Sequence, residues 1–398
     1  MKYPILAVIA AATLVGQTRA VSDAEVERVH RSALLIDTHN DVTSDTVKGL
    51  DIGPLRKEGH TDLVRLKQGG VGAVFFAAYV SGTYVQGNRS AHRTMEMIDT
   101  IRHDIVGRNP NGFELALTAG DIVAARKKGK IAALIGIEGG HGIEDSLRLL
   151  RDYYALGVRY MTLTHSNSNN WADSSGDAKK PHGGLNDLGR KVVAEMNRLG
   201  MMVDISHVAD DTFWDALETS RAPIFASHSS CRKLANIPRN MTDEMIVALA
   251  KKGGVVQINF GCEFLSQKSV DTSTWSNPKL NAEIRARAER EATDEASRRA
   301  LIRKLSQEAG HKTVPATLSD AVAHIDHIVK IAGIDAAGIG SDYDGVSCVP
   351  VGLEDVSKFP ALTRALLERG YTAEQIHKIY GGNLLRVMRA VEQAAAKR

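Results

Sequence analysis

Eight short apolar runs recur along this chain of 398 residues, and each is followed by a polar cluster and then by a stretch with helical spacing. They occupy residues 33–37, 72–80, 132–137, 159–163, 201–205, 223–226, 255–259 and 337–340. Short runs that are apolar throughout predict strands buried on both faces, and helices between the strands predict parallel pairing. Eight strands that alternate with helices favour a (β/α)8 TIM barrel with loop and helical insertions.

An open, doubly wound sheet is the alternative architecture. Such a sheet would be expected to carry a glycine-rich phosphate loop after its first strand, and this chain has none there. A barrel needs roughly 250 residues, so the remainder must lie in insertions. The charged segment 264–315 contains "NAEIRARAEREATDEASRRALIRKL", which predicts a solvated helix with opposite-charge pairs. The polar loop 166–187 is expected to form part of an active-site wall.

The first twenty residues, "MKYPILAVIAAATLVGQTRA", combine Lys2, an apolar stretch and an A-x-A-like ending. This pattern predicts a signal peptide over residues 1–20, and hence one barrel domain over 21–398 that is exported to the periplasm or secreted. An uncleaved membrane anchor is the alternative, although the apolar run is shorter than the roughly 20 residues that span a bilayer. The final "VEQAAAKR" lacks the hydrophobic tail of a lipid-anchor signal, so no stable membrane anchor is expected.

The charge and the cysteine count limit the partners. A formal net charge of +3, with no basic stripe between aromatic residues, argues against nucleic acid as a partner. There are three cysteines, so at least one thiol stays free or pairs between chains, and no disulfide framework is expected to hold the fold together. A homodimer is compatible with the sequence.

Polar residues that could bind a metal or move protons follow six of the predicted strands. They are His39, Asp41, Glu138, His165, His207, His228, Asp342 and Asp344. Barrel enzymes build their sites at the carboxyl ends of the strands, so these side chains should meet at one mouth of the barrel. Each histidine alone would more often be structural, but four at one mouth favour a functional site. Residues two apart on a strand share a face, so His39 and Asp41 should point the same way.

The mixture of imidazole and carboxylate groups suits zinc. The five candidate ligands are His39, Asp41, Glu138, His207 and His228. They exceed what one catalytic zinc needs and suffice for two ions if Glu138, on the third strand, bridges them. Two ions roughly 3.5–4 Å apart can share a water, lower its pKa and stabilise a hydrolytic transition state. We therefore predict two Zn²⁺ ions per subunit.

Three further residues have candidate roles in catalysis or substrate binding. Asp342 could take a proton from the bridging water and pass it to a leaving amine, or it could only close the barrel by hydrogen bonding. His165 could donate to the developing oxyanion, or hold its own loop. Arg239 could bind a substrate carboxylate through two hydrogen bonds, and a solvated role fits its position equally well.

These residues lie in stretches that resemble the membrane dipeptidase family, also called renal dipeptidases, a branch of the metal-dependent amidohydrolase barrels. The matching stretches are "IDTHNDV", "IGIEGGH", "LTHSNSNNWADS", "MMVDISH", "ASHSSC", "IPRNMTDE" and "GIGSDYDG". They occur in the family's order, and the likeness runs from about residue 34 to the closing "GGNLLRV" near residue 386.

The resemblance implies two zinc ions, one bound by His39 and Asp41 and the other by His207 and His228, with Glu138 bridging. It also implies that His165 contacts the substrate near the scissile carbonyl, that Arg239 holds the C-terminal carboxylate and that Asp342 moves the proton. Members of the family hydrolyse dipeptides, often accept a D-residue at the C-terminal position and in some cases open β-lactam rings.

The chain departs from the family at two places. Gly261 follows "INF", where the better-known animal members have an aromatic hydroxyl, and the charged segment 264–315 has no evident counterpart. We predict an exported zinc dipeptidase that acts on dipeptides, including L-Xaa-D-Xaa substrates, through a metal-bridging hydroxide. The alternatives are a hydrolase of the same metal site acting on a lactam, lactone or phosphotriester, and an exported binding protein without catalysis.

Overall fold

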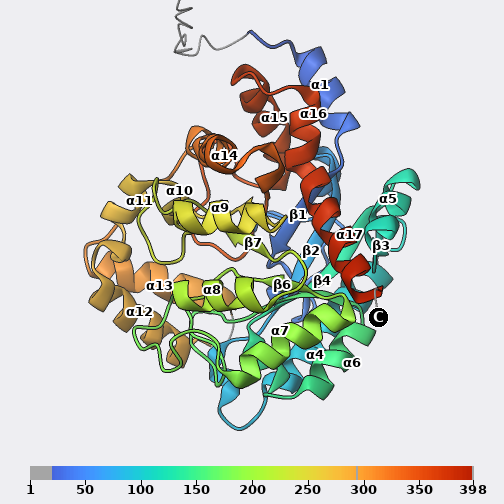
Figure 1. The fold of residues 1–398 in the computed structure, drawn as a ribbon. Coiled ribbons are helices and arrows are strands. Elements are labelled where there is room, and N and C mark those ends of the chain that lie inside the picture. The colour runs from blue at the N-terminus through green and yellow to red at the C-terminus, as the bar shows by residue number, and fades with distance from the viewer. Residues whose placement is uncertain (1–19, 293–294, 397–398) are drawn as a thin grey trace, which may run out of the picture.

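A computed structural model describes residues 20–292 and 295–396 of the chain. The strands lie in the centre of the view in Figure 1 with helices around them. The predicted signal peptide, residues 1–20, lies outside the described residues except for Ala20. In the part of the chain that the structure describes, no helix is both long enough and apolar enough to cross a membrane.

Eight strands form a continuous parallel sheet, and each follows the previous one in space as it does in sequence. They are β1 (Leu35–Asn40), β2 (Val71–Tyr79), β4 (Ile131–Glu138), β5 (Val158–Thr162), β6 (Met202–Asp204), β7 (Phe225–Ser229), β8 (Val255–Ile258) and β9 (Ala337–Ile339). Nearly all of their residues are buried, as expected for strands covered on both faces. The prediction of a (β/α)8 barrel is confirmed.

The ring closes between the end of β1 and the residues that follow β9. The backbone N–H of Asp342 donates to the carbonyl of His39 over 3.0 Å, and the N–H of Asp41 donates to the carbonyl of Tyr343 over 2.9 Å. Below these bonds, the Asp37 carboxylate accepts from the N–H and the hydroxyl of Ser341. The first and last strands are therefore joined next to the candidate site residues.

One short strand, β3 (Phe113–Leu115), was not predicted. It pairs with the first residues of β4 and lies outside the barrel's strand order. With only three residues, "FEL", and a glutamate at its centre, it carries neither an apolar run nor a usable alternation.

Helices fill the connections between the strands. The principal ones are α1 (Asp23–Ser32), α3 (Leu63–Gln68), α4 (Ser90–Thr100), α5 (Ala119–Lys127), α6 (Leu147–Ala155), α7 (Asp187–Leu199), α8 (Asp210–Thr219), α9 (Asp243–Lys251), α14 (Leu318–Ala332), α15 (Phe359–Glu368) and α17 (Asn383–Ala396). Local capping explains their limits. In α7, for example, the Asn186 side chain accepts from the backbone N–H groups of Leu188 and Gly189, and the helix ends at Gly200, whose φ is +84°.

The charged segment differs from its prediction. It does not form one solvated helix, because the chain becomes extended at Ala292, between α12 (Pro278–Glu291) and α13 (Glu295–Glu308). The two helices pack against each other. The expected ion pairs occur at Arg287–Glu291 and Lys304–Glu308. However, Ile284, Ala288 and Leu305 are buried, so each helix also has an apolar side that the charge pattern conceals.

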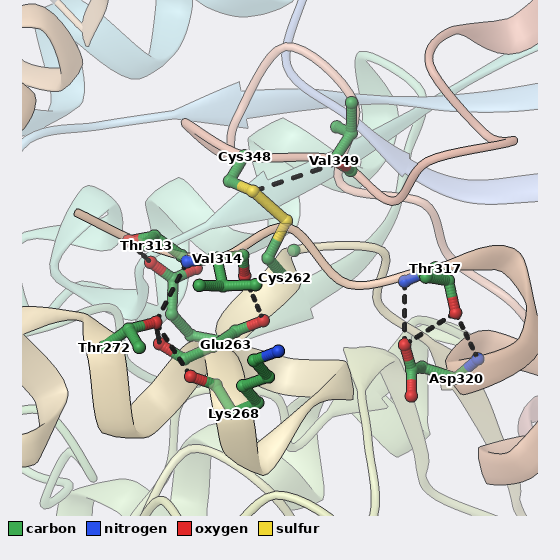
Figure 2. The surroundings of a disulfide bond; sticks show 12 residues. Cys262, Glu263, Lys268, Thr272, Thr313, Val314, Thr317, Asp320, Cys348 and Val349 are labelled. Carbon is green, nitrogen blue, oxygen red and sulfur yellow. Dashed lines mark hydrogen bonds between the residues drawn. A yellow bond between two sulfur atoms is a disulfide. The ribbon is translucent and has the colours of Figure 1, made fainter.

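A disulfide joins the base of this insertion to the loop after β9. Cys262 opens the short helix α10 (Cys262–Leu265) and bonds to Cys348, with 5.5 Å between their Cα atoms (Figure 2). The remaining cysteine, Cys231, is a buried free thiol. The prediction that an odd cysteine is left over is consistent with this pairing.

Candidate metal centre and active site

The end of β1 directs His39 and Asp41 to the same face. Their side chains are buried, and His39 Nε2 lies 3.2 Å from Asp41 Oδ2. The next residues of the chain turn into the short helix α2 (Thr43–Thr46), so the two side chains stay at the strand end. The structure thus brings together the pair that strand periodicity predicts to share a face.

Glu138, the last residue of β4, lies between the candidate ligands of the other strands. Its Oε2 atom lies 3.6 Å from His39 Nε2, and its Oε1 atom lies 3.0 Å from His207 Nε2 and 3.3 Å from His228 Nε2. One carboxylate therefore presents a separate oxygen to each half of the cluster.

Hydrogen bonds fix the tautomer of His39. Tyr160, within β5, donates its hydroxyl proton to the Thr38 carbonyl, so its oxygen must accept from Nδ1–H of His39 at 2.9 Å. With Nδ1 bonded to Tyr160, Nε2 is the ring nitrogen that faces the carboxylates of Asp41 and Glu138 and could bind a metal ion. Orientation of this kind by a second partner is typical of metal-binding histidines.

His228 is oriented in the same way by a different pair of residues, Ser227 and Asp204. The Ser227 hydroxyl donates to Asp204 Oδ2 over 2.6 Å and therefore accepts from Nδ1–H of His228 at 2.7 Å. The Nε2 lone pair of His228 then faces Glu138 and lies 3.0 Å from His207 Nε2. Two imidazole nitrogens and one carboxylate oxygen therefore point toward the same position, as the ligand atoms of one metal ion would.

The donor set fits divalent metal ions. Among the described residues, His39 Nε2 is a buried nitrogen without a hydrogen-bond partner. Three overlapping groups have ligand atoms close enough to share an ion: His39 with Glu138 and His228, Glu138 with His165 and His207, and His39 with Asp41 and Asp342. Burial lowers the pKa of His207 and of His228 well below the ordinary value, which favours the neutral imidazole that binds metal.

The backbone at two of these positions is left-handed. His207 has φ +68° and Asp342 has φ +61°, a region that residues other than glycine seldom occupy. In both cases the residue lies three residues after the last residue of its strand, in the turn that leaves the barrel. Backbone conformations of this kind are concentrated at functional sites.

Asp342 lies beside the ligands and is oriented by a residue that sequence reasoning missed. Asn259 donates from Nδ2 to Asp342 Oδ2 over 2.7 Å. Burial, and then the charge of Asp41, raise the pKa of Asp342 to about 7. A divalent ion beside Asp41 would oppose this shift by favouring the charged carboxylate. Gly345 is required here, since a Cβ atom on it would lie 2.2 Å from the carboxylate oxygens of both Asp342 and Asp41.

His165 is buried on the other side of Glu138, with its Nε2 3.7 Å from Glu138 Oε1. The Tyr79 ring, at the end of β2, packs edge-on against it with 4.7 Å between centroids. The Ser174 hydroxyl holds the carbonyls of both His165 and His207. Only Ser166 of the loop 166–187 is among the described residues that line the cavity, so this loop contributes less to the active-site wall than the sequence predicts.

Arg239 is not solvated, so that alternative for it is wrong. Its guanidinium is buried and donates to Ser229 Oγ and to the His228 carbonyl, each over 2.8 Å. Its Nε has no hydrogen-bond partner among the described residues. The group packs over the Phe264 ring, 5.5 Å from the centroid, behind the residues that line the cavity.

One cavity of about 460 Å³ is lined by Asp41, Glu138, His165, His207 and Asp342, and also by residues of the insertion. The same reasoning from strand ends could also have found Asn259, the last residue of the seventh predicted strand, and Tyr79, the last residue but one of the second. It could not have found Tyr160, Asp204 or Ser227, because these lie within strands and act through the ligands.

Comparison with known proteins gives one family. The sequence profile of the membrane dipeptidase family, peptidase family M19, matches residues 23–398. An uncharacterized dipeptidase of Schizosaccharomyces pombe is 35% identical over 399 residues, covering 95% of this chain and 85% of the relative. Dipeptidase verJ of Clonostachys rogersoniana is 37% identical over 379 residues, covering 91% and 85%.

A solved structure of a probable dipeptidase has the same fold. The probable dipeptidase PvdM from Pseudomonas aeruginosa superposes with a TM-score of 0.80 at 26% identity, covering 94% of this chain and 98% of that one. This likeness extends over the whole barrel. The chain therefore belongs to the membrane dipeptidase family, peptidase family M19, and is a hydrolase that acts on dipeptides.

Proposed function

We propose that this dipeptidase works with two zinc ions, one bound by His39 and Asp41 and the other by His207 and His228, with Glu138 bridging them. The observation that carries the proposal is the arrangement of Glu138, whose Oε2 faces His39 while Oε1 faces His207 and His228. Zinc ions bound in this way would lower the pKa of a shared water to give a nucleophilic hydroxide and would polarise the peptide carbonyl.

The chain's own residues supply the remaining chemistry. Asp342, held by Asn259, accepts a proton at its carboxylate when the nucleophile forms and delivers it to the leaving amine. His165 donates from its ring to the oxygen of the tetrahedral intermediate. Its lowered pKa, caused first by burial and then by the charge of Arg298, favours a neutral imidazole.

Arg239 is proposed to bind the C-terminal carboxylate of the dipeptide. It is a buried cation with an unsatisfied Nε, and a carboxylate would complete its hydrogen bonding. By likeness to the family, we propose that substrates include L-Xaa-D-Xaa dipeptides.

Removing and restoring the metal tests the proposal. Purified protein should contain two zinc ions per chain by elemental mass spectrometry, lose dipeptidase activity after chelation and regain it with zinc. A panel of L,L and L,D dipeptides, with a lactam and a lactone as competing substrate classes, identifies the bond that is cleaved. Full activity in metal-free protein would exclude this mechanism.

A further inference from the structure

We propose that the insertion between β8 and α14 makes this site selective for dipeptides whose C-terminal residue carries an acidic side chain. The inference rests on the proposed dipeptidase function and names its substrate class.

The part of the cavity wall that the insertion contributes is basic. From the insertion, the side chains that line it include Arg285, Arg298, Arg299, Arg303, His311 and Lys312. The acidic side chains of residues 264–315 that the structure describes are Asp271, Glu283, Glu291 and Glu308, and none of these four lines the cavity. Glu263, at the base of the wall, does line it, but burial raises the pKa of its carboxyl and favours the uncharged form.

The basic wall and the reacting groups share one cavity. Arg285 and Arg298 line it together with His165. Since charges interact over roughly 10 Å in salt solution, these guanidinium groups lie within electrostatic reach of a substrate held at His165. A neutral dipeptide has only one anionic group, its C-terminal carboxylate, and Arg239 is proposed to take that group.

A row of rings connects Arg239 to the wall. The Arg239 guanidinium lies over the Phe264 ring, Phe264 packs edge-on against Trp275 at 6.5 Å, and Arg285 lies 4.8 Å over the Trp275 ring. Phe264, Trp275 and Arg285 all line the cavity. A substrate whose C-terminal carboxylate reaches Arg239 therefore places the side chain of that same residue, rather than of the N-terminal one, nearest to the basic wall.

The wall is held in place on both sides. At its base the Cys262–Cys348 disulfide fixes α10, and Thr313 Oγ1 donates to Glu263 Oε1 over 3.3 Å (Figure 2). The N–H of Val314 also donates to Thr272 Oγ1 over 2.9 Å, so both ends of the insertion lie together.

On the far side, α12 packs on η1 (Gly82–Val85) and α13 on α2. Arg299 donates to the carbonyl of Asp344, two residues from Asp342. The basic groups thus belong to a structured wall that spans the mouth, rather than to a free loop.

Isosteric substrate pairs test the selectivity. With zinc-loaded full-length protein, kcat/KM should be at least tenfold higher for L-Ala-D-Asp than for L-Ala-D-Asn, and the same should hold for L-Ala-L-Asp over L-Ala-L-Asn if both are cleaved. The ratio should fall as salt is raised, because partly exposed charges are screened. The reversed pairs, L-Asp-L-Ala and L-Asn-L-Ala, should differ much less.

Variants assign the effect to the wall. Arg303 and Lys312 are exposed residues that line the cavity, so Arg303→Gln and Lys312→Gln should each reduce the acid-to-amide ratio at least threefold. The matched control is Arg287→Gln on α12, an exposed residue paired with Glu291 that is not among the lining residues, and it should keep the wild-type ratio.

The outcomes separate this proposal from the one on which it rests. Cleavage of the acid and the amide at equal rates, a preference confined to the N-terminal residue, or a ratio unchanged in Arg303→Gln and Lys312→Gln would each overturn the acidic selectivity alone. Failure of the zinc-loaded protein to cleave any dipeptide would overturn the proposed function and this inference together.

Discussion

At the scale of single residues, the orientation of the proposed ligands depends on side chains that never touch the substrate. Tyr160 accepts from Nδ1–H of His39, and Ser227 accepts from Nδ1–H of His228. The Tyr160 hydroxyl donates its proton to the Thr38 carbonyl, and the Ser227 hydroxyl donates its proton to Asp204, so each can only accept from the histidine. The nitrogen that faces the cluster is therefore decided by hydrogen bonds inside the barrel.

Tyr160→Phe should weaken metal binding while leaving the fold intact. The substitution removes the acceptor of Nδ1–H, so His39 can adopt the wrong tautomer or rotate, and loss of such a partner typically costs 10–100-fold in metal affinity. Competition with a chromogenic chelator measures this affinity.

The control is Tyr380→Phe, which removes an equally buried hydroxyl from its bond to Thr363, away from the site. It should leave metal affinity unchanged. An equal loss in both variants would mean that Tyr160 acts only through general stability.

His324, on α14, should make stability depend on pH. Its ring is buried, with Nδ1 accepting from the N–H of Cys231 and Nε2 donating to the Leu265 carbonyl. A second ring proton would have to sit on Nδ1, where it would point at the N–H of Cys231 and break that hydrogen bond. Burial lowers the pKa of His324 to about 4, whereas in the unfolded chain it is about 6.5. Between these values the unfolded chain binds the extra proton and the folded chain does not, so stability is lost as the pH falls from about 6.5 towards 4.

Comparison with His324→Gln isolates this contribution from other titrating groups. The difference in unfolding free energy between wild type and variant should shrink by about 1.4 kcal/mol per pH unit below pH 6.5. Urea denaturation at pH 7, 6 and 5 provides the values. Parallel pH profiles for the two proteins would show that His324 is not kept neutral.

At the scale of elements, the strands could be predicted and the packing of the insertion could not. Burial on both faces leaves a short apolar run within or next to each barrel strand, whereas β3 has only three residues. The insertion carries the same i,i+4 charge pairs whether it forms one helix or two. Which of its sides faces the cavity is decided by contacts with α2 and η1, far away in sequence.

The same distinction holds for the site. Strand-end position brings together His39, Asp41, Glu138, His165, His207, His228 and Asp342, because parallel strands in a barrel all end at one mouth. The burial of Arg239 could not be predicted from the sequence of its loop. One of the groups packed against its guanidinium is the Phe264 ring, which belongs to the insertion.

The disulfide should stabilise the insertion against the barrel. It closes a loop between positions 86 residues apart, so Cys262→Ser combined with Cys348→Ser should lower the unfolding free energy by about 2–4 kcal/mol. Urea denaturation with and without dithiothreitol measures it. Reductant should move the wild-type midpoint to that of the double variant and leave the double variant unaffected. A reductant-insensitive wild type would contradict this assignment.

At the scale of the whole molecule, we propose that the protein is exported and that the mature chain begins at Val21. Two observations support this: a disulfide is stable in an oxidising compartment, and the described chain makes defined contacts from Val21 onwards. Ser22 caps α1 by accepting from the N–H of Glu25, and the Val21 carbonyl accepts from Arg364.

Mass spectrometry of protein recovered from the periplasm or medium of an expressing bacterium should find Val21 at the N-terminus. Expression of the chain from Val21 onwards should retain the protein in the cytoplasm. Recovery of the intact 398-residue chain in the membrane fraction would instead favour an uncleaved anchor.

The closure of the barrel has a consequence for how the enzyme is made. The backbone bonds that join the first strand to the last involve His39 and Asp41 on one side and Asp342 and Tyr343 on the other. A ribosome must therefore release more than three hundred residues after His39 before that residue can meet its neighbours across the seam. The proposed ligands end at His228, so the seam beside the first two of them is completed only after all five have left the ribosome.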